Sequence, residues 1–139
     1  MTPEQLDLVE SSVAALGTVL DDVVEAFYDR LFELEPATRQ LFGGDLVAQR
    51  TKFAAELAFI MTTIRRHETF VATASDLGRR HGELGVHAEQ FRTAGVALLD
   101  AMAGALGPAW TPALSDAWRL AYRLTAEMMM AGIARPPGG

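Results

Sequence analysis

Asp76-Leu77-Gly78-Arg79-Arg80-His81-Gly82-Glu83-Leu84-Gly85-Val86 is the stretch of sequence that decides the fold. Phe70, Leu77 and His81 recur at intervals that place them on one face of an α-helix, and that face is otherwise apolar. Gly82 follows directly, which predicts that the helix ends within a turn. An imidazole on an apolar face is either a hydrogen-bonded core residue or a metal ligand, and this stretch alone leaves both open.

The rest of the chain predicts further helices, separated by Gly, Pro and polar residues. Upstream, the predicted elements are a helix capped by Thr2, a helix from Asp21 to Glu35, a short turn from Pro36 to Phe42 closed by Gly43 and Gly44, and a helix capped by Asp45. After a polar break at 65–68 come the helix of His81, a helix from Ala88 to Leu106, and a last helix that starts at Thr111 and Pro112. No segment alternates as a β-strand does. We therefore predict an all-α fold of about seven helices packed orthogonally, because their lengths are too unequal for a four-helix bundle.

Length and composition limit how the chain can be organised. Its 139 residues, 50% of them hydrophobic, predict one domain over residues 1–134 and a flexible Pro/Gly tail over residues 135–139. The lack of cysteine excludes disulfides, thiolate chemistry and Cys-bound metals, which leaves His and carboxylates as metal ligands. A net charge of −6 argues against a nucleic-acid partner, and no apolar run approaches the ~20 residues that span a membrane. We expect a cytoplasmic protein.

Three polar residues interrupt the apolar interior that the helical periodicity predicts: Tyr28, Gln49 and His81. A buried hydroxyl, amide and imidazole each need a partner, and a pocket that holds a polar ligand on a metal would satisfy all three. Each also has an ordinary explanation. Tyr28 could be a core tyrosine whose hydroxyl reaches the surface, and Gln49 could lie at a helix start and reach water.

Other chemistries find little support in the sequence. There is no Gly-rich phosphate loop, nucleophile elbow or His-Glu-x-x-His zinc helix. The 18 acidic residues fall mainly on the predicted outer faces, so no carboxylate pair for hydrolysis can be placed. The run Met128-Met129-Met130 is explained by core packing.

The chain resembles the globins over essentially its whole length, and in particular the single-domain bacterial globins and the globin domain of flavohaemoglobins. The matching pieces are Phe27-Tyr28-Asp29-Arg30-Leu31-Phe32, Leu41-Phe42, Gln49 with Lys52-Phe53, Leu77-Gly78-Arg79-Arg80-His81, Gly85-Val86, Gly95 with Leu98-Leu99, and Asp116-Ala117-Trp118 with Ala121-Tyr122. The short link from Phe42 to Gln49 is similar to globins that lack the small helix present there in vertebrate forms.

This resemblance implies a haem b cofactor and the diatomic ligands O2, CO and NO. In that family the histidine matching His81 is the proximal ligand of the iron, and the phenylalanine matching Phe42 packs against the porphyrin. Tyr28 and Gln49 match positions on the distal side, where the gas binds. We expect the haem faces to be covered by Phe42, Phe53, Leu57, Leu77, Val86 and Phe91, and the propionates to be met by Lys52, Arg80 and His87.

The distal residues predict how a gas would be held. The amide of Gln49 is a poor iron ligand, so we predict a ferrous iron that is five-coordinate before gas binds. The hydroxyl of Tyr28 and the amide of Gln49 are hydrogen-bond donors, each contributing ~1–3 kcal/mol to a polar ligand, which favours slow release of O2.

The chain also departs from the flavohaemoglobin pattern on the proximal side. There, a tyrosine and a glutamate on the last two helices hold the proximal histidine, whereas Phe91 and Ile133 stand at the matching positions here. The resemblance then implies a weaker electron push toward bound oxygen, and the 139 residues contain no reductase domain.

We therefore expect reversible O2 binding, storage or gas sensing rather than catalysis, by a monomer or homodimer. The first alternative is NO dioxygenase or peroxidase-like activity with an external reductase. The second is a haem-free helical interaction module, because each residue taken singly has an ordinary core explanation.

Overall fold

The computed structural model describes residues 1–42 and 44–134, and within them it consists of helices and the turns that join them. The α-helices are α1 (Pro3–Leu16), α2 (Leu20–Leu34), α3 (Leu46–Thr63), α4 (His67–Glu83), α5 (Ala88–Leu106) and α6 (Pro112–Ala134). The short 3-10 helices are η1 (Gly17–Val19), η2 (Pro36–Leu41) and η3 (Gly107–Ala109). The predicted all-α fold is confirmed, and the predicted turn after Pro36 is the 3-10 helix η2. The predicted tail of residues 135–139 lies outside the described residues, as does Gly43, and the single domain over residues 1–134 stays a prediction.

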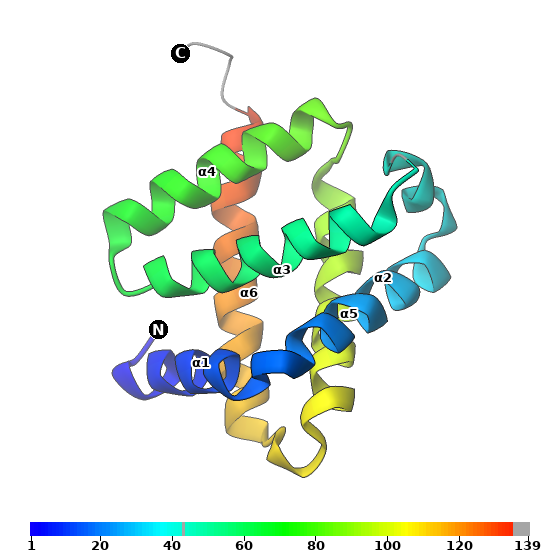
Figure 1. Cartoon of the computed structure of the whole chain (residues 1–139). Helices are drawn as coiled ribbons and strands as arrows, with labels where there is room; N and C mark the ends of the chain where they lie inside the picture. Colours follow the sequence, from blue (N-terminus) through cyan, green and yellow to red (C-terminus); the bar gives the residue numbers. More distant parts are fainter. Residues whose placement is uncertain (43, 135–139) are drawn as a thin grey trace.

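The helices cross one another steeply, as predicted. Figure 1 shows α5 and α6 standing side by side while α1, α2, α3 and α4 run across them. The most extensive packing is between α4 and α6 and between α2 and α5. The helix of His81 is therefore held against α6, and the helix of Tyr28 against α5.

Two glycines let α4 and α6 touch backbone to backbone. A Cβ atom added at Gly78 would lie 2.0 Å from the carbonyl oxygen of Met129, and one at Gly132 would lie 2.0 Å from that of Ser75. No side chain fits into such a contact, so the crossing is possible only with glycine at both positions. This close contact fixes where α4 lies along α6, and therefore where His81 is placed.

Side-chain caps set where three of the helices begin, as the sequence predicts. Thr2 forms a capping box with Gln5 at the start of α1. The Asp45 carboxylate accepts from the backbone N–H of Ala48 at 3.0 Å, and the Thr111 hydroxyl accepts from that of Leu114 at 3.2 Å. The Asp45 cap fixes the first turn of α3, which carries Gln49.

The link between η2 and α3 is short. Of the residues between Leu41 and Leu46, the structure describes Phe42, Gly44 and Asp45, and none of these is helical. The predicted lack of a small helix at this point is confirmed for those residues, and it brings Phe42 close to α3.

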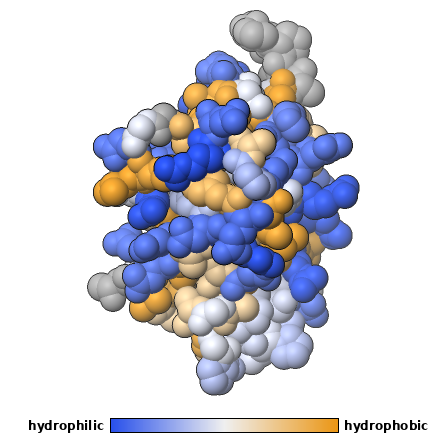
Figure 2. Space-filling model, turned by 90° about the vertical axis from the view of Figure 1, so that its right-hand side faces the viewer, coloured by the Kyte–Doolittle hydropathy of each residue, from blue (hydrophilic) through white to orange (hydrophobic). Residues whose placement is uncertain are grey.

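A buried core lies where the two sets of helices cross. Trp118 of α6 is 1% exposed, and its indole N–H donates to the hydroxyl of Ser12 in α1 at 2.8 Å. The surface seen in Figure 2 is mostly hydrophilic, with hydrophobic residues emerging in several places. Among the described residues, no helix has the length and apolar character to cross a membrane.

Candidate functional site

A cavity of about 190 Å³ lies between α3 and α4 and reaches inward to α5 and α6. Lys52 and Arg80 line it together with deep residues such as Trp118. The structure brings all but one of the predicted site residues to this cavity: Tyr28, Phe42, Gln49, Lys52, Phe53, Leu57, Leu77, Arg80, His81, Val86 and Phe91. His87 is not among its lining residues. The roles that the sequence analysis gives these residues toward a haem and its gas ligand stay predictions.

The imidazole of His81 is held by one hydrogen bond within its own helix. Its Nδ1 lies 2.7 Å from the carbonyl oxygen of Leu77, four residues earlier. A carbonyl oxygen can only accept, so Nδ1 carries the proton in the neutral ring. The lone pair is then on Nε2, the atom that can bind a metal ion.

The surroundings of His81 are apolar. The ring centroid of Phe91 lies 6.4 Å from that of His81, and Ile133 packs so closely on Gly82 that an added Cβ would lie 3.2 Å from its side chain. Among the described residues, the ring of His81 makes no hydrogen bond besides the one to Leu77. Within the described part of the chain, no carboxylate accepts a hydrogen bond from this ring.

Tyr122 supports the position of Phe91. Its hydroxyl donates to the carbonyl oxygen of Phe91 at 2.5 Å, and its ring packs on Gly95, where an added Cβ would lie 2.7 Å from a ring carbon. Burial raises the pKa of the Tyr122 hydroxyl well above its usual range, so the hydroxyl stays protonated and remains a donor.

Tyr28 of α2 and Gln49 of α3 meet in the wall of the cavity. The amide nitrogen of Gln49 donates to the Tyr28 hydroxyl at 3.3 Å. Tyr28 is 2% exposed, and its burial raises the pKa of the hydroxyl despite the opposing hydrogen bond from Gln49. Because the hydroxyl oxygen accepts from Gln49, its own hydrogen can be donated to a group in the cavity.

Aromatic rings hold Tyr28 in this orientation. Phe42 meets its ring edge to face at a centroid distance of 5.4 Å. Phe53 meets it at 5.7 Å and stacks in turn on Phe27 at 4.6 Å. Such pairs restrict the tilt of the Tyr28 ring, so the direction of its hydroxyl is set before any ligand arrives.

The mouth of the cavity carries charges from both walls. Arg80 of α4 pairs with Glu56 of α3 at 3.5 Å and with Asp76 at 3.3 Å. Lys52 is exposed on α3. His87 lies at the start of α5, where its backbone N–H donates to the side-chain oxygen of Gln90 at 2.9 Å.

Glu56 is a charged lining residue that the sequence analysis missed, because the acidic residues were expected mainly on outer faces. Gln49, Phe53 and Glu56 follow at intervals of four and three residues, so helical spacing did contain a signal for it.

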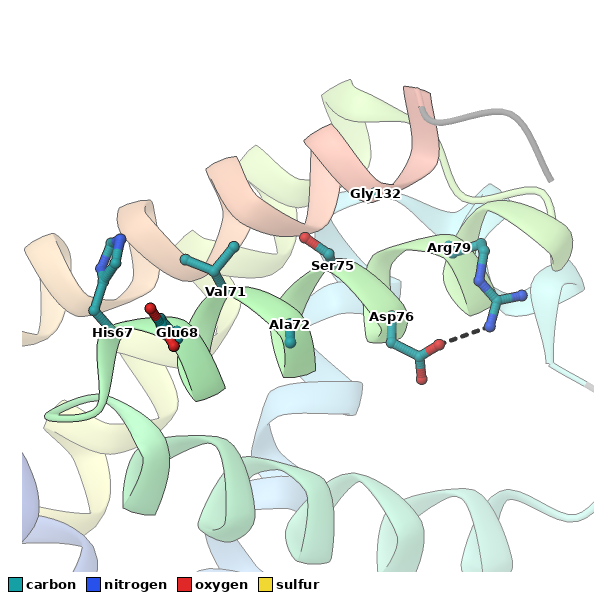
Figure 3. Close-up of a pocket in the computed structure, with 8 residues that line it drawn as sticks. All are labelled: His67, Glu68, Val71, Ala72, Ser75, Asp76, Arg79 and Gly132. Carbon is teal, nitrogen blue, oxygen red and sulfur yellow. Dashed lines mark hydrogen bonds and ion pairs between the residues drawn. The ribbon is translucent and has the colours of Figure 1, made fainter. Parts of the chain in front are cut away.

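A second hollow lies on the outside of α4. It is an open groove of about 530 Å³ where α4 crosses α6, and it is lined by His67, Glu68, Val71, Ala72, Ser75, Asp76, Arg79 and Gly132. Figure 3 shows these residues along α4, with Gly132 beside Ser75 and with Asp76 paired to Arg79. None of them lines the cavity of His81.

The donor set of the cavity fits a haem. One imidazole lines a slot walled by aliphatic and aromatic side chains, and two hydrogen-bond donors line the same slot. In the part of the chain that the structure describes, no three His, Cys, Asp or Glu gather as a metal cage.

Comparison with known proteins agrees with this fit. Residues 25–129 match the family model described as Globin. The chain is a member of the globin family. Membership implies that the protein binds haem, and it makes haem-based gas binding plausible.

Bacterial proteins are among the relatives of this globin. The chain is 29% identical to a flavohemoprotein of Deinococcus radiodurans, in an alignment that covers 99% of this chain and 37% of that protein. It spans about a third of the length of the curated flavohemoproteins it matches, with shares of 37%, 31% and 33%.

Two solved structures show the same fold. One is a proposed nitric oxide dioxygenase of Rhodothermus marinus engineered as a carbene transferase, with a TM-score of 0.86, 28% identity, and coverage of 96% of this globin and 94% of that chain. The other is a bacterial globin of Campylobacter jejuni, with a TM-score of 0.84, 24% identity, and coverage of 94% and 95%.

Proposed function

We propose that this globin holds haem b through Nε2 of His81 and reversibly binds O2, CO and NO, for oxygen binding, storage or gas sensing. The observation that carries the proposal is the hydrogen bond of 3.3 Å from Gln49 to Tyr28, in the cavity that His81 also lines. It leaves the Tyr28 hydroxyl hydrogen for a ligand. Haem bound there would supply an iron with an open coordination position.

The residues near the distal side favour an iron without a sixth protein ligand. The Gln49 amide is a poor ligand, and its nitrogen is already engaged with Tyr28. Lys52 is exposed at the mouth of the cavity. We therefore expect a five-coordinate deoxy ferrous spectrum, and a six-coordinate one would contradict the assignment of the distal residues.

The proximal side supports binding more than catalysis. Phe91 and Ile133 give the imidazole no anionic partner, and its proton is shared only with a backbone carbonyl among the described residues. A neutral imidazole donates less electron density to iron than one held by a carboxylate, and electron donation favours O–O bond cleavage.

The alternative is NO dioxygenase or peroxidase-like activity with an external reductase. It is favoured by the flavohemoprotein and nitric oxide dioxygenase relatives. Sustained NADH-linked consumption of NO, measured with an added reductase beside a flavohaemoglobin assayed in parallel, would support it over reversible binding. A single stoichiometric turnover without sustained consumption would support binding.

His81→Ala tests the ligand assignment, with His67→Ala as the matched control. We expect His81→Ala to lose most of its affinity for haemin and the Soret shifts with O2 and CO, whereas His67→Ala keeps both because His67 is exposed at the other end of α4 and does not line the cavity. An unchanged spectrum in His81→Ala would refute the assignment. A chain that stays colourless in haem-replete cells and takes up no added haemin would favour the haem-free module.

A further inference from the structure

One ion pair joins two walls of the cavity that His81 lines. Nη1 of Arg80, on α4, lies 3.5 Å from the carboxylate of Glu56, on α3, and both residues line the cavity. The side chain of Glu56 is 25% exposed and that of Arg80 is 45% exposed, so the pair lies at the mouth of the cavity. Any movement of α3 away from α4 has to break it.

The cavity has to widen before it can take a haem. Its volume is about 190 Å³, whereas sites that enclose a drug-sized ligand measure about 300–1,000 Å³. A haem is at least as large as such a ligand. At least one wall of the cavity therefore moves outward when haem enters or leaves.

The wall formed by α4 is held too firmly to be the one that moves. An added Cβ at Gly78 or Gly132 would lie 2.0 Å from a carbonyl oxygen of the facing helix, so the backbones of α4 and α6 are in contact. The packing between these two helices is also the most extensive in the described part of the chain.

The first half of α3 is the wall that can move. The buried residues of this helix are Ala54, Ile60, Met61 and Thr63, so three of the four lie in its last turn. Just beyond that turn, Arg65 pairs with Asp7 and Glu10 of α1. None of residues 46–53 is buried. Figure 1 shows α3 and α4 meeting at the turn between them and spreading apart toward the start of α3.

We propose that Glu56 is a positioning residue that fastens α3 to α4 across the mouth of the cavity, and that its pair with Arg80 slows the escape of haem. The haem part of this inference rests on the proposed function, whereas the fastening is a property of the chain alone. Arg80 uses Nη1 for Glu56 and Nε for Asp76, at 3.3 Å. Neither pair uses Nη2, so the guanidinium can also donate to a haem propionate while it holds Glu56.

The fastening is weak enough to open. Asp76 lies one turn before Arg80 on the same helix, so their pair survives a movement of α3. The carboxylate of Glu56 is already partly exposed and passes into water. Opening therefore breaks one partly exposed ion pair, which changes an equilibrium constant by about two- to five-fold. The pair slows the exchange of a ligand and does not block it.

Transfer of haemin from the full chain to an excess of haem-free myoglobin measures the escape rate. We expect Glu56→Gln to release haemin about two- to five-fold faster than the original protein. In an Arg80→Gln background the same substitution should have no further effect, because the pair is already broken. Glu68→Gln is the matched control, since Glu68 is exposed on α4 and does not line the cavity. An unchanged rate in Glu56→Gln, or equal acceleration in both backgrounds, would overturn the proposal.

Thiol labelling of the haem-free chain tests the fastening without haem. The chain has no cysteine, and Leu77 lines the cavity from α4 at 9% exposure, so a thiol introduced by Leu77→Cys is labelled when the cavity opens. We expect Glu56→Gln to speed labelling about two- to five-fold and Glu68→Gln to leave it unchanged.

The two measurements separate this inference from the proposed function. A chain that takes up no haemin refutes the proposed function, and the labelling rates then decide on the fastening. A chain that binds haemin but shows the same labelling rate in Glu56→Gln and in Glu68→Gln refutes the fastening alone.

Discussion

The amide nitrogen of Gln49 donates a hydrogen bond of 3.3 Å to the hydroxyl of Tyr28, which joins the first turns of α3 to the middle of α2. The bond makes the Tyr28 oxygen an acceptor and so directs its own hydrogen elsewhere. In an apolar cavity a donor of this kind discriminates between ligands by their polarity. The first prediction follows from that discrimination.

Tyr28→Phe deletes the hydroxyl and keeps the ring. We expect the O2 dissociation rate of the haem-loaded protein to rise about tenfold, which corresponds to a loss of about 1.4 kcal/mol. The CO dissociation rate should change little, because CO is the less polar ligand. Stopped-flow ligand replacement measures both rates on the same sample. Equal changes for O2 and CO would show that the hydroxyl does not act as a donor to the ligand.

Gly78→Ala should destabilise the protein by about 2 kcal/mol or more, because its Cβ would meet the Met129 carbonyl at 2.0 Å and force α4 from α6. Gly104→Ala is the matched control. Gly104 lies within α5 with no atom within 4 Å of an added Cβ, so we expect a gain of about 0.4–1 kcal/mol. Urea unfolding of both variants measures the difference. A neutral Gly78→Ala would mean that α4 and α6 can separate at no cost.

Ser12→Ala should cost about 1–3 kcal/mol, because it leaves the buried indole N–H of Trp118 without its partner. Ser115→Ala removes a hydroxyl whose bond to Arg119 is exposed, and we expect a change within about 0.5 kcal/mol. Thermal unfolding of the two variants compares a buried with an exposed hydroxyl. Similar losses in both would point to a general effect of serine replacement.

Stability should fall above pH 10, because burial raises the pKa of both tyrosines, Tyr28 and Tyr122. An unfolded tyrosine ionises near 10.0, whereas the folded one keeps its proton to higher pH. The unfolded state therefore binds fewer protons in this window, and stability present below pH 10 is lost as pH rises toward the folded pKa. Each tyrosine contributes a slope of up to about 1.4 kcal/mol per pH unit.

Tyr122→Phe should reduce that slope. We expect the free energy of unfolding of the haem-free variant to fall less steeply than that of the original protein between about pH 10 and 11. Urea unfolding at a series of pH values measures it. Parallel curves across this range would show that Tyr122 ionises equally in both states.

Local sequence determined most of the secondary structure. The helix predicted from Ala88 to Leu106 has those bounds in the structure, and the Thr2, Asp45 and Thr111 caps act as expected. These features depend on residues three or four positions apart, so the sequence contains everything that decides them. The polar break predicted at 65–68 is shorter in the structure and lies earlier, because α3 ends at Thr63 and α4 already begins at His67.

The same local periodicity placed Tyr28, Gln49 and His81 on inward faces, and even the bond of His81 to Leu77 lies within one helical turn. What the periodicity could not decide is which inward faces meet. The bond from Gln49 to Tyr28 and the pair of Glu56 with Arg80 each join two different helices, beyond the reach of helical periodicity. Their geometry depends on how these helices pack, and the place of α4 is fixed in turn by the contact of Gly78 with Met129 on α6. Crossing distances of this kind come from packing between distant segments, which is why only the tertiary structure decided them.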